Sequence, residues 1–414
     1  MAIGIVRKVK SVKDKKQSIH IPQGFLFAAG EAGLRTHGRG PDVGLIYSMT
    51  PAGVAALFTS NRVKAAPVVV SQEHLRRTHH IARAIVVNAG NANCATGARG
   101  LRAAKRCAEA AGKLLGLPPE HVLLASTGVI GLPLDERRIT DVLPTLARRM
   151  HPLGYEAVSN AILTTDTRPK VVSRTILLSD RNVHVLGMAK GSGMIYPRLA
   201  TMLGFLFTDA AVEPRFLRAA ASRLCNLSFN RISVDGDTST NDTFFLMANG
   251  LAGNLLIRGN SSAAEKLFQA LTEVAHELAV KMVMDGEGAR KLVEIHVEGG
   301  RSERQASAIA RSIGLSSLVK TALAGSDPNW GRILSAAGSA NVEFDPDHAD
   351  IYLNSVLVCR GGEAAEYNEA ALIRQLHAKK ILIRVVLKQG KAEATFWTCD
   401  FTEDYVRINA SYRT

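Results

Sequence analysis

The chain has 414 residues, 46% of them hydrophobic and 21% charged, which is typical of one large globular domain or two smaller ones. It has no uninterrupted apolar stretch of about 18 residues and no apolar secretory signal near its start, so we expect neither a spanning helix nor a membrane partner. Its net charge of +14 would attract nucleic acid or anionic metabolites, but aromatic residues make up only 5% and no nucleic-acid-binding motif is present.

Cysteine usage points to a reducing compartment. The five cysteines are dispersed and form no C-x-x-C pair, which argues against a disulfide framework or a zinc ribbon. We therefore expect a cytoplasmic protein without a bound metal.

Strand-like and helix-like segments alternate along the chain, and this pattern predicts a mixed α/β fold in layers. The expected strands are residues 84–87, 170–178, 183–188, 202–207, 292–297, 349–358, 381–387 and 392–397. The expected helices are residues 99–115, 135–150, 213–224, 262–284, 303–313 and 368–377, with Gly116 as the C-cap of the first.

Common catalytic and nucleotide-binding motifs are absent from the sequence. The segment Lys190-Gly191-Ser192-Gly193 is not a phosphate-binding loop, because its lysine precedes the glycines. No G-x-S-x-G nucleophile elbow occurs. The usual hydrolase and nucleotide-binding templates therefore do not describe this protein.

Small and polar residues instead gather where strands or helices are expected to end. Thr127 and Gly128 follow an apolar run, and a glycine-containing turn there is either an oxyanion-binding site or a simple turn. The segment 233–242 is rich in hydroxyl and acidic side chains and favours a rigid, hydrogen-bonded loop over an ion cage, because it lacks the closing glutamate of an EF-hand. In Asp285-Gly286-Glu287-Gly288, which ends a long predicted helix, we expect one carboxylate to be exposed, either to hold an amine or as a solvated helix end.

In this order the motifs resemble the ornithine acetyltransferase family, also called glutamate N-acetyltransferases, of arginine biosynthesis. The resemblance spans nearly the whole chain. Its segments are Gly90-Asn91-Ala92-Asn93, Ser126-Thr127-Gly128, Thr164-Thr165-Asp166-Thr167, Lys190-Gly191-Ser192-Gly193, Ala200-Thr201-Met202-Leu203, residues 235–242, Asp285-Gly286-Glu287-Gly288, Asp327-Pro328-Asn329-Trp330 and the tail 408–414.

The resemblance implies a self-processed enzyme with a layered α/β sandwich of the DmpA/ArgJ-like type. Cleavage between Ala200 and Thr201 would give an α subunit of residues 1–200 and a β subunit of residues 201–414, assembled as an α2β2 heterotetramer. Thr201 would then be an N-terminal nucleophile. Its own α-amine, with an ordinary pKa near ~8, would serve as the base.

The same resemblance implies the reaction and its site residues. Thr201 would take the acetyl group from N2-acetylornithine and pass it to glutamate by ping-pong transfer. Thr127 and Gly128 match the oxyanion hole, and no cofactor is implied, although acetyl-CoA is a second candidate donor. The matching substrate-binding positions are Thr164, Lys190, Thr201, Glu287, Asn409 and Thr414.

Two alternatives stay open at this point. A self-processing amidase or aminopeptidase of related fold would use water in place of glutamate as the acceptor. A basic nucleic-acid-binding protein, from a different class, would bind DNA or RNA in a salt-sensitive way and would not cleave itself.

Overall fold

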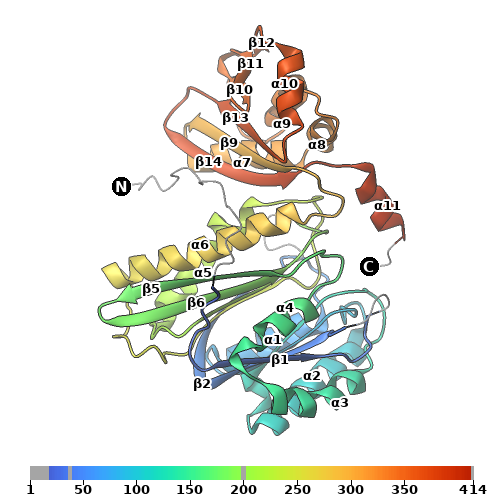
Figure 1. The fold of residues 1–414 in the computed structure, drawn as a ribbon, viewed down its shortest axis with the longest axis vertical. Coiled ribbons are helices and arrows are strands. Elements are labelled where there is room, and N and C mark those ends of the chain that lie inside the picture. The colour runs from blue at the N-terminus through green and yellow to red at the C-terminus, as the bar shows by residue number, and fades with distance from the viewer. Residues whose placement is uncertain (1–17, 36–39, 197–201, 412–414) are drawn as a thin grey trace.

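The computed structural model describes residues 18–35, 40–196 and 202–411, and they form two layers of sheet and helix. The larger layer, at the bottom of Figure 1, holds an eight-stranded sheet in the order β4-β3-β2-β8-β7-β6-β5, with β1 paired to β2. The smaller layer, at the top, holds a six-stranded sheet in the order β12-β11-β10-β13-β9-β14.

The larger layer is built from residues 25–284. Its strands are β1 (Phe25–Gly30), β2 (Val43–Phe58), β3 (Ile81–Asn88), β4 (Val122–Ser126), β5 (Lys170–Leu178), β6 (Arg181–Lys190), β7 (Leu203–Thr208) and β8 (Thr243–Ala248). Its helices are α1 (Ala66–Arg77), α2 (Gly97–Leu115), α3 (Glu136–Arg149), α4 (Tyr155–Ala161), α5 (Pro214–Leu227) and α6 (Ser262–Met284).

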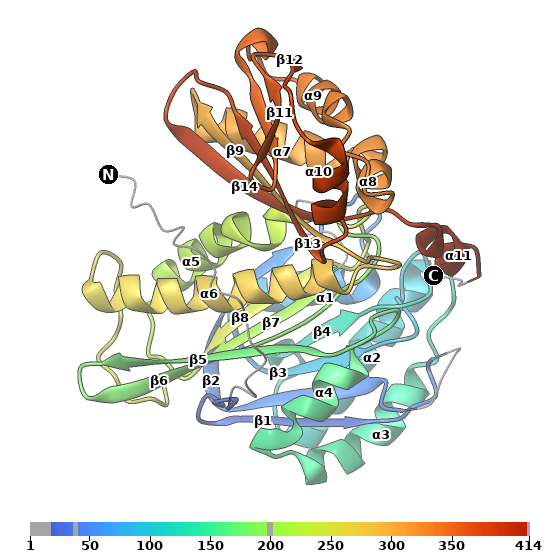
Figure 2. The ribbon, with the colours of Figure 1, turned by 45° about the horizontal axis from the view of Figure 1, so that its top comes forward.

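The smaller layer follows, and a last helix returns to the larger one. Its strands are β9 (Leu292–Gly300), β10 (Asp350–Leu353), β11 (Val356–Arg360), β12 (Glu363–Ala364), β13 (Lys380–Val386) and β14 (Ala392–Cys399). Its helices are α7 (Glu303–Leu315), α8 (Ser317–Ala324), α9 (Trp330–Gly338) and α10 (Glu369–Leu376). Helix α11 (Glu403–Ser411) leaves the smaller layer after β14 and lies beside the larger layer (Figure 2).

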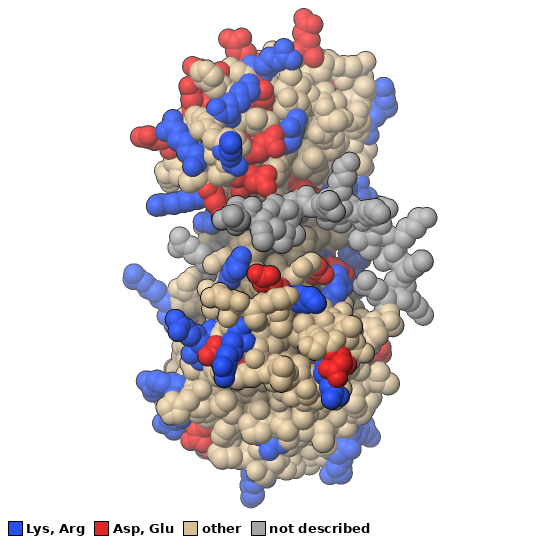
Figure 3. Space-filling model, turned by 90° about the vertical axis from the view of Figure 1, so that its left-hand side faces the viewer, with Lys and Arg blue, Asp and Glu red and all other residues tan. Residues whose placement is uncertain are grey.

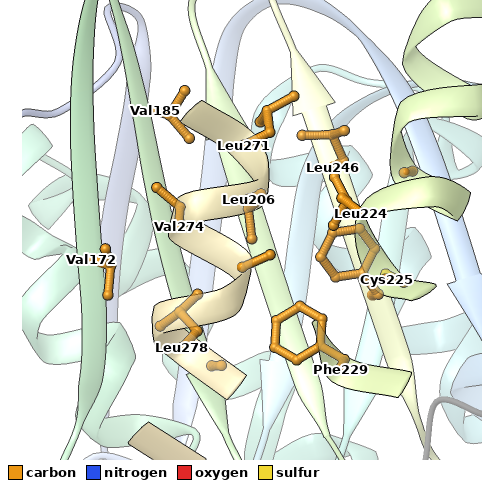
Figure 4. Packing of buried hydrophobic residues seen from close by; sticks show 14 of the residues in the cluster. Val172, Val185, Leu206, Leu224, Cys225, Phe229, Leu246, Leu271, Val274 and Leu278 are labelled. Atoms are coloured by element: carbon orange, nitrogen blue, oxygen red, sulfur yellow. The ribbon is translucent and has the colours of Figure 1, made fainter. Parts of the chain in front are cut away.

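Helices α5 and α6 lie between the two sheets and cover the larger one. Figure 4 shows Leu271, Val274 and Leu278 of α6 packed over strand residues of the larger sheet. The helix approaches so closely that a Cβ on Gly187 of β6 would lie 2.4 Å from Val274 Cγ1 and 2.7 Å from Leu278 Cδ1. Glycine at position 187 therefore lets α6 dock onto the sheet.

The predicted α/β layers are confirmed, and most predicted elements are present. Helix α6 covers the residues expected for it, and Gly116 caps α2 in the left-handed conformation, at φ +65°. The single strand predicted over 349–358 is wrong. It is the hairpin of β10 and β11, because Asn354 takes a left-handed turn conformation at φ +54°.

The described segments on either side of the Ala200–Thr201 bond contribute strands to one sheet. Strand β6 pairs antiparallel with β7, and β2 pairs antiparallel with β8. Residues 25–190 and 203–248 thus contribute neighbouring strands to the same sheet. Separating the chain at this position would leave its two parts joined by strand pairing and a shared core.

The surface carries its charge in a dispersed form. On the face in Figure 3, Lys and Arg side chains are spread over both layers, and Asp and Glu side chains lie among them on both. Within the described ranges, no helix is both long enough and apolar enough to cross a bilayer.

Candidate active site

Six of the predicted site residues line one pocket between the larger layer and α11. They come from loops and element ends that are far apart in the sequence. These residues are Thr127, Gly128, Thr164, Lys190, Glu287 and Asn409. Ala200, Thr201 and Thr414 lie outside the described residues.

The start of β7 lies beside this pocket. Lys190, the last residue of β6, is the register partner of Leu203, the first residue of β7. Just before Leu203, the backbone N–H of Met202 donates to Asp242 Oδ1 at 2.9 Å. The chain therefore enters β7 next to a residue that lines the pocket.

The turn after β4 presents two candidate donors for an oxyanion. The backbone N–H of Thr127 donates to the carbonyl of Asn88 at 2.9 Å, so this residue offers its hydroxyl to the pocket. Lys190 Nζ donates to Thr127 Oγ1 at 3.3 Å, which leaves the hydroxyl proton free to point elsewhere. Gly128 has φ +126°, and a Cβ there would lie 2.4 Å from the carbonyl carbon of Gly90. Only glycine fits at this position, and its N–H is the second candidate donor.

Lys190 brings a positive charge to the pocket although it is almost fully buried. Its ammonium group donates to Thr164 Oγ1 at 2.7 Å and lies 3.7 Å from Asp166 Oδ2. Burial lowers the pKa of Lys190, and the carboxylates of Asp166 and Glu287 oppose that change. An ammonium group held in this way suits a substrate carboxylate.

Glu287 brings a carboxylate to the same pocket. It follows the end of α6, and its backbone N–H donates to the carbonyl of Ser192 at 2.8 Å. Its carboxylate lies over Gly193, where a Cβ would be 2.4 Å from Oε2, and it accepts a hydrogen bond from Asn409 Nδ2 at 2.8 Å. The exposed carboxylate expected in this segment is not found, because Glu287 and Asp285 are both buried, Asp285 in an ion pair with Lys170.

The loop 233–242 forms one wall of the pocket and supports the neighbouring loops, as its composition predicts. Asp235 accepts hydrogen bonds from the backbone N–H groups of Met194 at 2.5 Å and Ile195 at 2.8 Å. Asn241 Nδ2 donates to the carbonyls of Ala92 at 2.7 Å and Ser126 at 2.8 Å. The loop thus ties together the segments that carry the predicted site residues.

Several charged or polar residues at or beneath the pocket are not predicted individually from the sequence. Tyr405 of α11 lines the pocket and its hydroxyl donates to Asp235 Oδ2 at 3.2 Å. Asp166 and Asp285 lie in recognised motifs without an individual role, and Lys170 gives no signal because it reads as the first residue of an ordinary strand.

Comparison with known proteins identifies the same family along almost the entire chain. The ArgJ family model matches residues 26–414. The "Arginine biosynthesis bifunctional protein ArgJ" of Symbiobacterium thermophilum is 43% identical over 394 residues, which is 95% of this chain and 98% of that protein. The protein of the same name from Desulfotalea psychrophila is 45% identical over 395 residues, 94% of this chain and 99% of that one.

Among solved structures, ornithine acetyltransferase from Mycobacterium tuberculosis, complexed with ornithine, is similar to part of the chain. The two are 31% identical in sequence, the match covers 44% of this chain and 94% of that chain, and the TM-score is 0.36.

Proposed function

The chain belongs to the ArgJ family and is an acyltransferase of arginine biosynthesis, and we propose that it moves the acetyl group of N2-acetylornithine to glutamate through an ester on Thr201. The observation that carries the proposal is a single pocket lined by a lysine, a glutamate and a Thr-Gly turn, Lys190, Glu287 and Thr127-Gly128. Two opposite charges in one pocket fit an amino acid whose side chain ends in an amine.

From the charges in the pocket we infer a role for each end of the donor. Lys190 binds the carboxylate of N2-acetylornithine, and Glu287 binds its side-chain ammonium group. The acetyl carbonyl then faces the Thr127 hydroxyl and the Gly128 N–H, which stabilise the negative charge that develops on its oxygen. Thr164 and Asn409 hold Lys190 and Glu287 in place through hydrogen bonds of 2.7 and 2.8 Å.

The transfer proceeds in two steps, formation of an acetyl ester on Thr201 and transfer of the acetyl group to glutamate. Thr201 Oγ attacks the acetyl carbon, its proton passes to the α-amine, and the C–N bond breaks so that ornithine leaves with that proton. Glutamate binds next, and its α-amine attacks the acetyl ester. The bond between the acetyl carbon and Thr201 Oγ breaks, the proton lost by the attacking amine passes through the α-amine of Thr201 to Oγ, and N-acetylglutamate departs.

The nucleophile is made by self-cleavage between Ala200 and Thr201. Thr201 Oγ attacks the Ala200 carbonyl carbon and the peptide C–N bond breaks, which frees the α-amine of Thr201 and leaves residue 200 joined to Oγ as an ester. Water then hydrolyses this ester, giving the carboxylate of Ala200 and restoring the Thr201 hydroxyl. The α and β subunits, residues 1–200 and 201–414, stay together because β6 pairs with β7 and β2 pairs with β8. We also propose an α2β2 heterotetramer in the cytoplasm that needs no cofactor, with acetyl-CoA as a second acetyl donor.

An acceptor-dependence assay tests the function. Purified protein is incubated with N2-acetylornithine with and without glutamate, and ornithine and N-acetylglutamate are measured. We expect ornithine release at a steady rate only when glutamate is present. Steady release without glutamate would instead identify a self-processing amidase.

A further inference from the structure

A cluster of four buried charges lies at the base of the pocket. Its members are Lys190, Asp166, Lys170 and Asp285, and each side chain is at most 3% exposed. Lys170 Nζ lies 2.6 Å from Asp166 Oδ1 and 2.6 Å from Asp285 Oδ2. Two ammonium groups thus alternate with two carboxylates, and the more exposed Arg168 Nε lies 3.9 Å from Asp285 Oδ1 at the edge of the cluster.

Only one member of this cluster reaches the pocket. Lys190 is among the residues lining it, whereas Asp166, Lys170 and Asp285 are not. The Lys190 ammonium group therefore faces the pocket while the Asp166 carboxylate lies 3.7 Å from it within the protein. Of these four side chains, Lys190 is therefore the one placed to contact a substrate in the pocket.

Asp166 is itself fixed from several directions. Its Oδ1 accepts the backbone N–H of Gly191 at 2.7 Å, and its Oδ2 accepts that of Thr164 at 3.2 Å. Gly191 follows Lys190 in the chain, and Thr164 accepts a hydrogen bond from Lys190 Nζ. Asp166 thus contacts the segments that carry Lys190 and its hydroxyl partner, and it is placed to orient the Lys190 side chain.

The charges around Lys190 act on it in opposite directions. Burial lowers the pKa of Lys190; the Asp166 carboxylate raises it, Lys170 lowers it further, and Glu287 across the pocket raises it. Asp242, on the loop that precedes β8, is a further acidic group that interacts with Lys190. For Asp166, burial would raise the pKa, but Lys190 and Lys170 outweigh it and lower the pKa to about 2.

We propose that Asp166 and Lys170 are positioning residues that control the charge and direction of the Lys190 ammonium group, Asp166 by favouring the charged form and Lys170 by limiting it. They touch no substrate. The inference rests on the proposed function only in the role it gives Lys190, which is to receive the carboxylate of each amino-acid substrate. The opposing influences of Asp166 and Lys170 would let Lys190 bind that carboxylate and release it again within one turnover.

NMR titration of Lys190 tests the proposal without requiring activity. The full chain is labelled with ¹³C at lysine Cε, and Lys190→Met assigns the signal. Asp166→Asn should lower the pKa of Lys190 by about one unit or more, because a carboxylate this close shifts a neighbouring pKa by that amount. Lys170→Met should raise it, and Lys170→Arg, which keeps the charge, should leave it close to the wild-type value.

Lys320→Met is the matched control. Lys320 is another buried lysine, and it donates to Thr398 Oγ1 at 2.9 Å in a part of the chain that does not line the pocket. Its loss should weaken the fold without changing the Lys190 titration. An unchanged pKa in Asp166→Asn, or shifts of the same sign in Asp166→Asn and Lys170→Met, would overturn the proposal.

Kinetics on the same variants separates this inference from the proposed function. The alkaline limb of the kcat/KM profile for N2-acetylornithine should move to lower pH in Asp166→Asn and to higher pH in Lys170→Met. If the wild-type protein transfers no acetyl group, the proposed function is refuted. The NMR titration then still tests whether Asp166 and Lys170 act on Lys190. Normal acetyl transfer with the same alkaline limb of the kcat/KM profile in all variants would refute the positioning role and leave the proposed function standing.

Discussion

Replacing Gly193 with alanine is expected to weaken binding of the acetyl donor while leaving the fold intact. The new Cβ would lie 2.4 Å from the Glu287 carboxyl carbon and Oε2 and 2.5 Å from Oε1. These atoms are the end of a flexible side chain, so Glu287 can yield by turning away from its place in the pocket. It would then lose the contact that we propose between Glu287 and the ammonium group of N2-acetylornithine.

The size of the effect follows from the interaction that is lost. A hydrogen bond to a charged group contributes about 1.5–3 kcal/mol, and about 1.4 kcal/mol corresponds to a tenfold change in binding. We therefore expect KM for N2-acetylornithine to rise by roughly 10- to 100-fold. The lost contact is to the donor's side-chain ammonium group, away from the reacting carbonyl, so it should contribute equally to binding of the substrate and of the transition state. We therefore expect kcat to change much less than KM.

Steady-state kinetics on Gly193→Ala, Glu287→Gln and the double variant isolates the cause. If alanine acts by displacing Glu287, the double variant should resemble Glu287→Gln and the two effects should not add. Gly338→Ala is the control, because a Cβ at position 338 meets no atom within 4 Å. Additive effects, or an unchanged KM in Gly193→Ala, would refute the reasoning.

Three further predictions concern processing and stability. Asp235→Asn should slow self-cleavage about tenfold, because the Asp235 carboxylate holds the N–H groups of Met194 and Ile195, which precede the proposed cleavage site in the chain. Denaturing gels measure the cleavage rate, and a wild-type rate would contradict this. The pKa of Asp166 is lowered to about 2, so its ionised carboxylate stabilises the fold above about pH 4, and this stabilisation is lost as the pH falls through 2. Asp166→Asn should therefore make the free energy of unfolding in urea less dependent on acid pH. An unchanged pH dependence would count against this. Leu278→Ala should lower the free energy of unfolding by about 2–5 kcal/mol, since this fully buried side chain packs α6 on the sheet, and a change below about 1 kcal/mol would contradict that packing.

The sequence predicts the long, periodic elements well and the short, strongly turned ones poorly. Helix α6 follows from its apolar spacing and its N-cap, where Ser261 Oγ accepts the N–H of Ala264 at 3.1 Å. The sequence predicts one strand where β10 and β11 form a hairpin, because only Asn354 marks the turn between them. One left-handed residue between apolar runs is too weak a signal to separate two strands.

The residues of the candidate site also fall into two groups, those that the sequence predicts and those that it does not. Thr127, Gly128, Lys190 and Glu287 belong to motifs that the family resemblance singles out, and the fold brings them to one pocket. Lys170 could not be predicted from its own segment, because its role depends on Asp285, more than a hundred residues away in the chain. Buried charge pairs of this kind arise from tertiary packing, which local patterns do not encode.

The acetyl group carried by Thr201 is the central claim, and mass spectrometry tests it most directly. Processed enzyme is mixed with N2-acetylornithine in the absence of glutamate, quenched in acid and digested. We expect an added acetyl group on the peptide that begins at Thr201, its removal when glutamate is supplied before quenching, and no adduct in Thr201→Ala. An acetyl group on any other side chain, or none on a protein that transfers acetyl groups at the normal rate, would contradict the account.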